Sequence, residues 1–95
     1  MYIVELTYVK PLAELDAHLA AHRAFLDTQY AKENFLLSGA QTPRVGGVFV
    51  ASGRLTRDEL NEILAHDPFQ QNGLATYRVI EFTPTKSAPA LAGVL

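Results

Sequence analysis

The spacing of apolar residues changes along the chain, and the first change separates a strand from a helix. Residues 1–9 are rich in β-branched and aromatic side chains, which predicts a strand that ends before Lys10 and Pro11. Pro11 also suits the first position of a helix, where its missing N–H costs nothing. From Leu12 to about Asn34 the apolar residues recur three or four positions apart, so we predict one helix there. Its expected buried face carries Leu12, Leu15, Leu19, Leu26 and Tyr30.

Further strands are predicted by short apolar runs that turn residues separate. Residues 35–40 and 46–51 form two such runs, and the loop between them contains a proline, as in a hairpin with a longer turn. Residues 74–83 form the last run, which a proline ends. The residues that follow are rich in Pro, Ala and Gly and show no usable period. We therefore predict one domain over residues 1–84 and a C-terminal tail over residues 85–95.

A second helix is predicted by a capping signal and a short apolar stripe. Thr56 is followed three residues later by Glu59, the capping-box pattern that begins a helix. The helix is expected to end at Asp67, because the residue before a proline avoids the helical region. Residues 70–73, Gln-Gln-Asn-Gly, then predict a turn. The stripe of this helix consists of Leu60, Ile63 and Leu64.

The predicted order of elements is β-α-β-β-α-β. Two split βαβ units of this kind form the ferredoxin-like sandwich, which is an α+β fold. Its antiparallel four-stranded sheet carries both helices on one face. The chain itself therefore leaves the other face of the sheet uncovered.

Both faces of the predicted strands are apolar, so the face of the sheet without helices is apolar as well. Tyr2, Val4, Leu6 and Tyr8 alternate with Ile3 and Val9, and Val48 and Val50 alternate with Phe49 and Ala51. A monomer would expose an apolar surface on the order of several hundred Å², which soluble monomers rarely do. A twofold pair removes that surface by stacking two sheets face to face. We therefore predict a homodimer formed through the sheet.

Composition and charge narrow the class of protein. The chain has 95 residues, 48% of them hydrophobic, which is typical of one small folded domain and not of a disordered chain. Its formal net charge of -2 and its scattered Lys and Arg argue against nucleic-acid binding through phosphates and against a membrane-docking patch. The absence of cysteine excludes disulfides and thiolate chemistry. Because no apolar run approaches the roughly 20 residues of a membrane span and no signal-peptide pattern is present, we expect a cytoplasmic protein.

The chain has three histidines, the residue type best suited to proton transfer near neutral pH, and one of them interrupts an apolar stripe. His22 lies between Leu19 and Leu26 on the predicted inward face of the first helix. His18 lies at the edge of that stripe, where a solvated boundary position explains it. His66 ends the second helix, where the helix dipole alone favours a histidine. His22 is therefore the main candidate for chemistry, with a hydrogen-bonded core histidine as the ordinary alternative.

Asp67 is the expected partner of His22. In the predicted sandwich the two helices run antiparallel, so the first half of the first helix lies near the end of the second. An inward histidine with a carboxylate in reach is the minimum for a general base whose tautomer the partner fixes. Asp67 fits equally well a plain role in which its side chain caps the following turn. Both interpretations are open from the residues alone.

The histidines could alternatively be ligands of a metal ion. His18 and His22 are four residues apart, a spacing that suits a pair of metal ligands. No glutamate occupies the position between them that a zinc-protease motif requires. Asp67 or Glu14 would have to be the third ligand. We therefore predict no metal and no cofactor.

Several short segments, taken in order, carry a further signal. They are Tyr2-Ile3-Val4, His22, Leu36-Leu37-Ser38-Gly39, Ala65-His66-Asp67-Pro68-Phe69 and Gly73-Leu74. In this order and spacing the chain resembles the YciI-like (YCII-related) family over all but about its last ten residues. The Asp-Pro-Phe after a helix is the most specific piece. The resemblance implies a ferredoxin-like fold that dimerises into an α+β barrel, in agreement with the dimer expected from the strands.

The resemblance also implies a site and a class of chemistry. The family's His–Asp pair falls on His22 and Asp67. Many members carry an arginine three residues before that histidine, where this chain has Leu19, and a proline after the glycine of the second strand, where it has Ala40. The departure at Leu19 leaves the charge of the substrate open. A related member is a dehydrochlorinase of chlorinated hydroxyquinols, and muconolactone isomerases and cofactor-free monooxygenases share the fold. By analogy, these relatives imply proton transfer on small cyclic or aromatic compounds.

The leading hypothesis is a small cofactor-free enzyme of the lyase or isomerase type. His22 would take or deliver the proton, and Asp67 would orient the imidazole and stabilise its charged form. The second hypothesis is a non-catalytic dimeric module that binds a small ligand or serves as an accessory protein, with a structural His–Asp pair. A third is haem or metal binding through His22.

Four further residues are candidates for substrate binding. Ser38 and Tyr8 would hydrogen-bond the oxygens of a small-molecule substrate, and Phe69 and Phe25 would form an apolar wall. The plain alternative for Ser38 is a strand-end residue that satisfies backbone groups. For the aromatic residues it is ordinary core packing.

Overall fold

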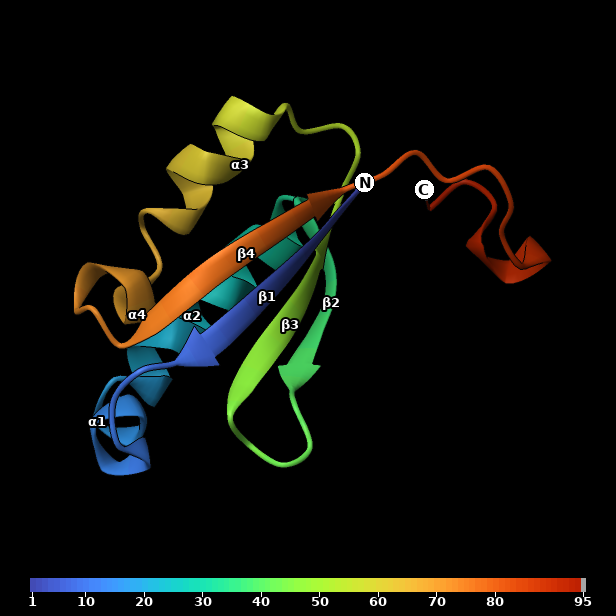
Figure 1. Cartoon of the computed structure of the whole chain (residues 1–95). Coiled ribbons are helices and arrows are strands. Elements are labelled where there is room, and N and C mark those ends of the chain that lie inside the picture. The colour runs from blue at the N-terminus through green and yellow to red at the C-terminus, as the bar shows by residue number, and fades with distance from the viewer. Residues whose placement is uncertain (95) are drawn as a thin grey trace.

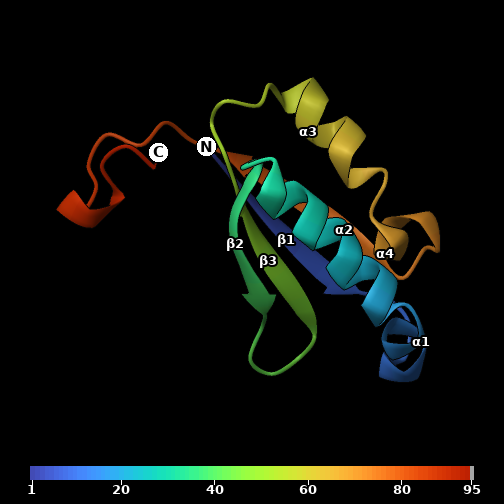
Figure 2. The same ribbon diagram turned by 180° about the vertical axis from the view of Figure 1, so that it is seen from behind.

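A four-stranded antiparallel sheet forms the centre of the structure. In the computed structural model, which describes residues 1–94, the strands run in the order β2-β3-β1-β4 and the helices lie on one face (Figures 1 and 2). The elements in chain order are β1 (Tyr2–Tyr8), α1 (Leu12–Ala17), α2 (Leu19–Ala31), β2 (Phe35–Ala40), β3 (Gly46–Ala51), α3 (Arg57–Leu64), α4 (Pro68–Gln71), β4 (Ala75–Glu81) and the short 3-10 turn η1 (Pro89–Leu91). This arrangement confirms the predicted ferredoxin-like α+β fold.

The register of the strands separates a buried face of the sheet from an open one. β1 lies between β3 and β4, so that Val4 pairs with Phe49 on one side and with Val79 on the other. Alternate residues of β1 point toward the helices, and Tyr2, Val4 and Leu6 are buried there. The core consists of Tyr2, Val4, Leu6, Leu15, Phe35, Phe49, Ala51, Leu60, Leu64, Phe69, Leu74 and Ala75.

The prediction of one helix from Leu12 to Asn34 is wrong, because the chain forms two helices that meet at His18. The φ of −109° and ψ of 5° at His18 lie outside the usual helical region. The last turn of α1 is closed by a bond of the 3-10 type, in which the His18 N–H donates to the Leu15 carbonyl at 3.0 Å. Leu15 is fully buried whereas Leu12 is 44% exposed, so the buried stripe begins later than predicted. None of the helices within residues 1–94 is both long enough and apolar enough to cross a membrane.

The second predicted helix begins as expected, and a short helix that was not predicted precedes the turn after it. Thr56 caps α3, and the two reciprocal bonds of the capping box with Glu59 measure 3.1 and 2.9 Å. The four-residue helix α4 takes in residues 70 and 71 of the predicted turn, and residues 72–73 form the turn itself, with Gly73 at a φ of 64°. Asp67 is its N-cap, and its carboxylate accepts from the Phe69 N–H. The proline at the first position favours this helix start because it has no N–H to satisfy.

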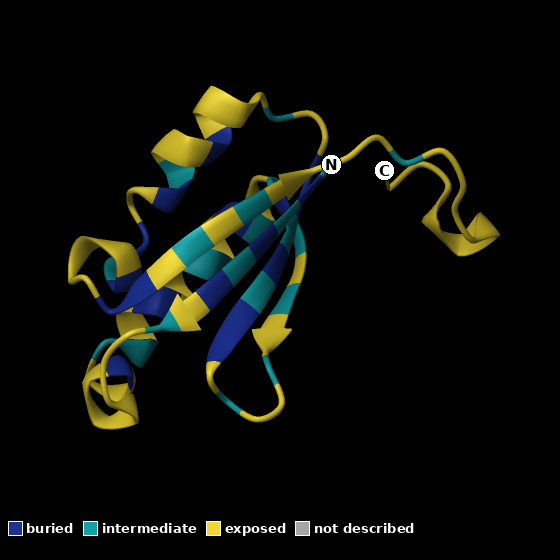
Figure 3. Cartoon of the chain, viewed as in Figure 1, coloured by how far each residue is buried: buried dark blue, intermediate teal, exposed yellow. Residues whose placement is uncertain are grey.

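Apolar residues line up across the face of the sheet that the helices leave open. Leu37 pairs with Val50, Val50 with Ile3, and Ile3 with Ile80, so one apolar row crosses all four strands. Leu37 is 60% exposed and Ile80 is 40% exposed. More and less exposed residues alternate along β4, as Figure 3 shows. The apolar character of both faces is confirmed, and the homodimer stays a prediction.

The C-terminal tail leaves the sheet beside the N-terminus. The Met1 amino group donates to the Phe82 carbonyl at 2.8 Å, and the Phe82 N–H donates to the Met1 carbonyl at 2.9 Å. Beyond this point the chain leaves the sheet, forms the turn η1 and comes back, so that Gly93 and Val94 line a pocket with the start of β2 (Figure 1). Leu95, the last residue of the predicted tail, lies outside the described residues.

Candidate active site

A buried histidine and a buried aspartate meet between α2 and the start of α4. His22 lies on the inward side of α2 and is 7% exposed, and Asp67 is completely buried. His22 Nδ1 lies 2.7 Å from Asp67 Oδ1. The predicted proximity of this pair is therefore confirmed.

Three hydrogen-bond donors converge on the Asp67 carboxylate. Oδ1 accepts from His22 Nδ1 and from the backbone N–H of Phe69 at 3.0 Å, and Oδ2 accepts from the Tyr77 hydroxyl at 2.5 Å. An ionised carboxylate can only accept, so His22 carries a proton on Nδ1. In neutral His22 this leaves Nε2 as the basic ring nitrogen.

The same carboxylate oxygen also places an aromatic ring against the imidazole. The bond from the Phe69 N–H to Asp67 Oδ1 caps α4 and fixes the start of the helix that carries Phe69. The Phe69 and His22 rings stack with centroids 3.9 Å apart and planes 3° from parallel. The Phe49 ring lies 6.0 Å from the imidazole at an angle of 28°. Asp67 thus fills both of the roles that the sequence left open, as a helix cap and as the partner that orients His22.

Tyr77 belongs to this network and was missed by the sequence analysis. It lies on β4 opposite Leu6 of β1, and therefore faces the helices. Burial, and after it the negative charge of Asp67, raise the pKa of the Tyr77 hydroxyl far above its ordinary value, so that it stays protonated and donates. The alternation of Ala75, Tyr77 and Val79 along the last strand is the signal that would have placed it inward.

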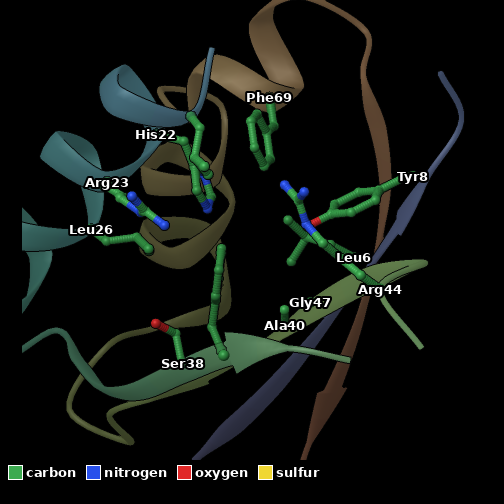
Figure 4. Close-up of a pocket in the computed structure, with 13 residues that line it drawn as sticks. Leu6, Tyr8, His22, Arg23, Leu26, Ser38, Ala40, Arg44, Gly47 and Phe69 are labelled. Atoms are coloured by element: carbon green, nitrogen blue, oxygen red, sulfur yellow. The ribbon is translucent and has the colours of Figure 1, made fainter. Parts of the chain in front are cut away.

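His22 lines a cavity of about 450 Å³ between α2, the sheet and the loop that joins β2 to β3 (Figure 4). Small-molecule sites are usually about 300–1,000 Å³, so this cavity has the size of a small-molecule site. Its large apolar side chains are Leu6, Leu19, Leu26, Phe49 and Phe69, and its polar ones are Tyr8, His22, Arg23, Ser38 and Arg44. In Figure 4 the His22 ring points from α2 into this space, beside Phe69. A ring nitrogen that can act as a base therefore borders a space that a substrate can enter.

Three of the four predicted substrate-binding residues line this cavity: Ser38, Tyr8 and Phe69. The Ser38 hydroxyl forms a short hydrogen bond with the Tyr30 hydroxyl, which holds it at the floor of the cavity shown in Figure 4. The Tyr8 ring meets the Phe69 ring edge-on, with centroids 6.0 Å apart and an interplanar angle of 86°. Side chains from β1, β2 and α4 thus share one wall and floor with His22.

The fourth predicted residue, Phe25, is not brought to this cavity. It lies about one turn beyond His22 on α2, where its ring packs edge-on against Phe35 with centroids 6.0 Å apart. It lines instead the groove between α2 and α3. Phe25 therefore takes the plain role of core packing in this geometry.

The other two histidines have local explanations. Nδ1 of His18 bonds to the Glu14 carbonyl at 3.1 Å, and Nδ1 of His66 bonds to the Glu62 carbonyl at 2.8 Å. Each is bonded to the backbone four residues earlier and not to the His22 network. Within residues 1–94, no three His, Cys, Asp or Glu side chains cluster in a way that could hold a metal ion.

Two arginines at the cavity were not predicted as site residues. Arg23 follows His22 on α2, and Arg44 lies in the loop between β2 and β3. Leu19, which stands where the resembling family often has an arginine, lines the same cavity. Leu19 carries no charge, but Arg23 and Arg44 place positive charge at the same cavity. Neither arginine had a signal in the sequence. Adjacent positions on a helix face different directions, so the place next to His22 does not predict Arg23 at the cavity, and Arg44 lies in a loop, which has no periodic pattern.

Comparison with known proteins places the chain in a family. The YCII-related domain family matches residues 1–83. No curated protein matches the chain. Among solved structures, 5-chloro-2-hydroxyhydroquinone dehydrochlorinase (TftG) from Burkholderia phenoliruptrix, in complex with 2,5-dihydroxybenzoquinone, is similar with a TM-score of 0.71 and 20% identity, over 87% of this chain and 94% of that chain. Because the family match spans nearly the whole domain, the chain belongs to the YCII-related domain family.

Proposed function

We propose that this protein is a small enzyme of the lyase or isomerase type that moves a proton on a small cyclic or aromatic compound. The observation that carries the proposal is the position of His22, which borders the cavity while Asp67 holds its Nδ1 at 2.7 Å. Histidine is the side chain most often used as a general base at neutral pH. The proposed chemistry uses side chains of this chain alone.

In the proposed mechanism, Nε2 of His22 takes a proton from the substrate and later delivers it. The Asp67 carboxylate holds the tautomer that leaves Nε2 free, and its charge stabilises the imidazolium that forms. The stacked Phe69 ring offers its electron-rich face to the same cation at 3.9 Å. Tyr77 acts as a positioning residue because it holds the second oxygen of Asp67. General-base catalysis of this kind contributes about 10²–10⁴-fold in rate.

The similar dehydrochlorinase supports the choice of a lyase. Loss of HCl from a chlorinated hydroxyquinol needs a base that accepts a hydroxyl proton. The base delivers this proton to the ring carbon that bears chlorine, while the electron pair left on oxygen forms a carbonyl. Removal of a second hydroxyl proton then forms a second carbonyl, the ring double bond shifts to the former C–Cl carbon, and chloride departs with the electrons of the C–Cl bond. The step therefore needs no external oxidant, and a single histidine is sufficient as the base. At 20% identity, the TM-score of 0.71 shows the shared fold alone, and the extension to this chain's own substrate is our proposal.

The substrate is proposed to lie between the polar floor of the cavity and the Phe69 ring. Ser38 and Tyr8 would hydrogen-bond its oxygens, since both line the cavity with His22. Phe69 would contact its ring from the α4 side. The roles of these residues rest on their placement around one space (Figure 4).

We also propose that two copies pair through the open face of the sheet. The apolar row of Leu37, Val50, Ile3 and Ile80 gives each copy the same apolar stripe. On the same face, Arg78 Nε lies 3.5 Å from Glu5 Oε1, so that both signs of charge flank the row. A twofold arrangement matches such a patch with itself.

The test is turnover of 5-chloro-2-hydroxyhydroquinone and of ring analogues that carry a carboxylate, followed by chloride release and quinone absorbance. His22→Gln should lose about 10²–10⁴-fold in rate. His66→Gln is the matched control, because His66 is exposed and bonded only to its own helix region. Turnover that His22→Gln abolishes and His66→Gln preserves supports the proposal. Turnover by wild type that is indifferent to His22, or none across the panel, contradicts it.

A non-catalytic ligand-binding module is the second candidate, and the complete burial of Asp67 with all its hydrogen bonds satisfied favours it. In that case the His22–Asp67 pair serves stability alone. Small ring compounds would then bind without being converted. Replacing His22 would weaken folding but would change no reaction rate.

A further inference from the structure

The cavity beside His22 is lined by positive charge, although the chain as a whole is acidic. Two of the chain's five arginines line it, and among residues 1–94 none of the lining residues is Asp or Glu. Asp67 lies behind His22 and is completely buried, so its charge is directed to the imidazole, the Tyr77 hydroxyl and the Phe69 N–H. A ligand in the cavity therefore meets cationic side chains and no carboxylate.

Arg44 is held in place at the rim of this cavity from two sides. One Nη of Arg44 donates to Asp16 Oδ1 on α1 at 2.7 Å. Its guanidinium carbon lies 5.8 Å from the centre of the Tyr8 ring, which lines the same cavity. The Arg44 side chain is 35% exposed, so it reaches both the cavity and the solvent. A guanidinium has five N–H donors, and the bond to Asp16 uses one edge of the group.

Arg23 stands on another side of the same space. Figure 4 shows the Arg23 and Arg44 guanidinium groups on opposite sides of the cavity, with His22 and Phe69 at one end and Ser38 at the other. Arg23 is exposed, whereas Arg44 is anchored by Asp16 and Tyr8. The anchored group loses less freedom when it binds a ligand, so it selects more strongly.

We propose that the cavity takes a small ring compound that bears a carboxylate, and that Arg44 is the residue that selects this charge. A guanidinium matches a carboxylate because two parallel N–H groups meet its two oxygens. This inference rests on the proposed function only for the location of the site. It adds the charge class of the ligand and the residue that recognises it. With Leu19 in place of the family's arginine, recognition of a negatively charged substrate would fall to Arg44 in the loop between β2 and β3.

The probes that test it are 2,5-dihydroxybenzoate and its neutral amide, 2,5-dihydroxybenzamide, which share ring and hydroxyl groups. Binding is measured by isothermal titration calorimetry, without turnover. We expect wild type to bind the benzoate about tenfold or more tightly than the amide, since charge-assisted hydrogen bonds are the strong ones. Added salt should weaken binding of the benzoate and leave the amide unchanged.

Arg44→Gln should remove the preference for the benzoate, because it should weaken binding of the benzoate far more than binding of the amide. Arg44→Lys should retain part of the preference, because the charge remains while the paired donors are lost. Arg57→Gln is the matched control, since Arg57 is exposed on α3 and bonds to Asn61 of the same helix. Arg23→Gln should have the smaller effect of the two cavity arginines. A thermal melt of each variant confirms that it folds.

Equal binding of the two probes by wild type, or a benzoate preference that persists in Arg44→Gln, would overturn the inference. These results are separate from those on the reaction. If the binding depends on Arg44 but no turnover depends on His22, the proposed reaction fails and the charge assignment stands. If turnover depends on His22 and the probes bind equally, the reaction stands and the charge assignment fails.

Discussion

The sharpest prediction on stability concerns Asp67, because three donors lose their acceptor when its carboxylate is removed. Asp67→Ala leaves His22 Nδ1–H, the Tyr77 hydroxyl and the Phe69 N–H without this partner in a buried region. An unsatisfied buried donor costs about 1–3 kcal/mol, and partial relaxation reduces the total. We therefore expect Asp67→Ala to lower the free energy of unfolding by about 3–5 kcal/mol. That is a large part of the roughly 5–15 kcal/mol that holds a typical domain together.

Asp67→Asn should cost much less, about 1–2 kcal/mol, because the amide reproduces most of the hydrogen bonds. Its oxygen can accept from His22 and from the Phe69 N–H in the place of Oδ1. Its NH₂ group then faces the Tyr77 hydroxyl, which can turn and accept. Asp27→Ala on the exposed side of α2 is the control and should change stability by less than about 0.5 kcal/mol.

The assay is urea unfolding followed by far-UV circular dichroism, since the chain has no tryptophan. All variants are compared at one protein concentration, because self-association would add to stability by mass action. With a slope of about 1 kcal/mol/M, Asp67→Ala should shift the midpoint by about 3 M or more. A loss below about 1 kcal/mol for Asp67→Ala, or equal losses for the two Asp67 variants, would refute the convergence of donors on this carboxylate.

Three further predictions concern other parts of the molecule. Tyr77→Phe removes the donor to Asp67 Oδ2, so it should lower the free energy of unfolding in urea by about 1–3 kcal/mol and lower kcat more than it changes KM. An unchanged kcat would show that Tyr77 does not position the pair. Ile80→Glu places a charge in the apolar row and should convert a dimer to a monomer in light scattering, whereas Leu12→Glu, at an exposed site of α1 on the helix side of the sheet, should not. A wild type that is monomeric at high concentration would contradict the proposed pairing. The hydrogen bonds that Glu59 makes with the backbone and side chain of Thr56 lower its pKa from 4.5, so the capping box stabilises the fold above about pH 4.5 and loses this effect as the pH falls through the lower folded pKa. The difference in melting temperature between wild type and Glu59→Gln should therefore vanish in acid, and a difference that stays constant with pH would argue against this role.

The fold was predictable because each strand and the start of α3 carry a local signal. The alternation of Tyr2, Val4 and Leu6 marks the buried face of β1, and the Thr56–Glu59 pair marks the start of α3. The break at His18 was not predictable, because the three- and four-residue spacing of leucines continues through it. A backbone change at one residue leaves no trace in a pattern of side chains.

The candidate site was predictable only in part, for a related reason. The His22–Asp67 pair follows from the antiparallel run of two helices, which the element order implies. Arg44 comes from a loop, and its place at the cavity depends on Asp16 and Tyr8, which hold it from other elements. Contacts of this kind depend on three-dimensional packing and not on spacing along the chain.

Asp67 shows why the two interpretations of one residue did not exclude each other. A helix cap and an orienting partner each need one acceptor, and a single carboxylate oxygen accepts more than one bond. In this structure Oδ1 receives both the Phe69 N–H and His22 Nδ1. Asp67→Asn keeps an oxygen at that place and removes the negative charge. A rate loss in Asp67→Asn that exceeds its loss of stability therefore measures how much the charge of Asp67, rather than its geometry, stabilises the imidazolium of His22.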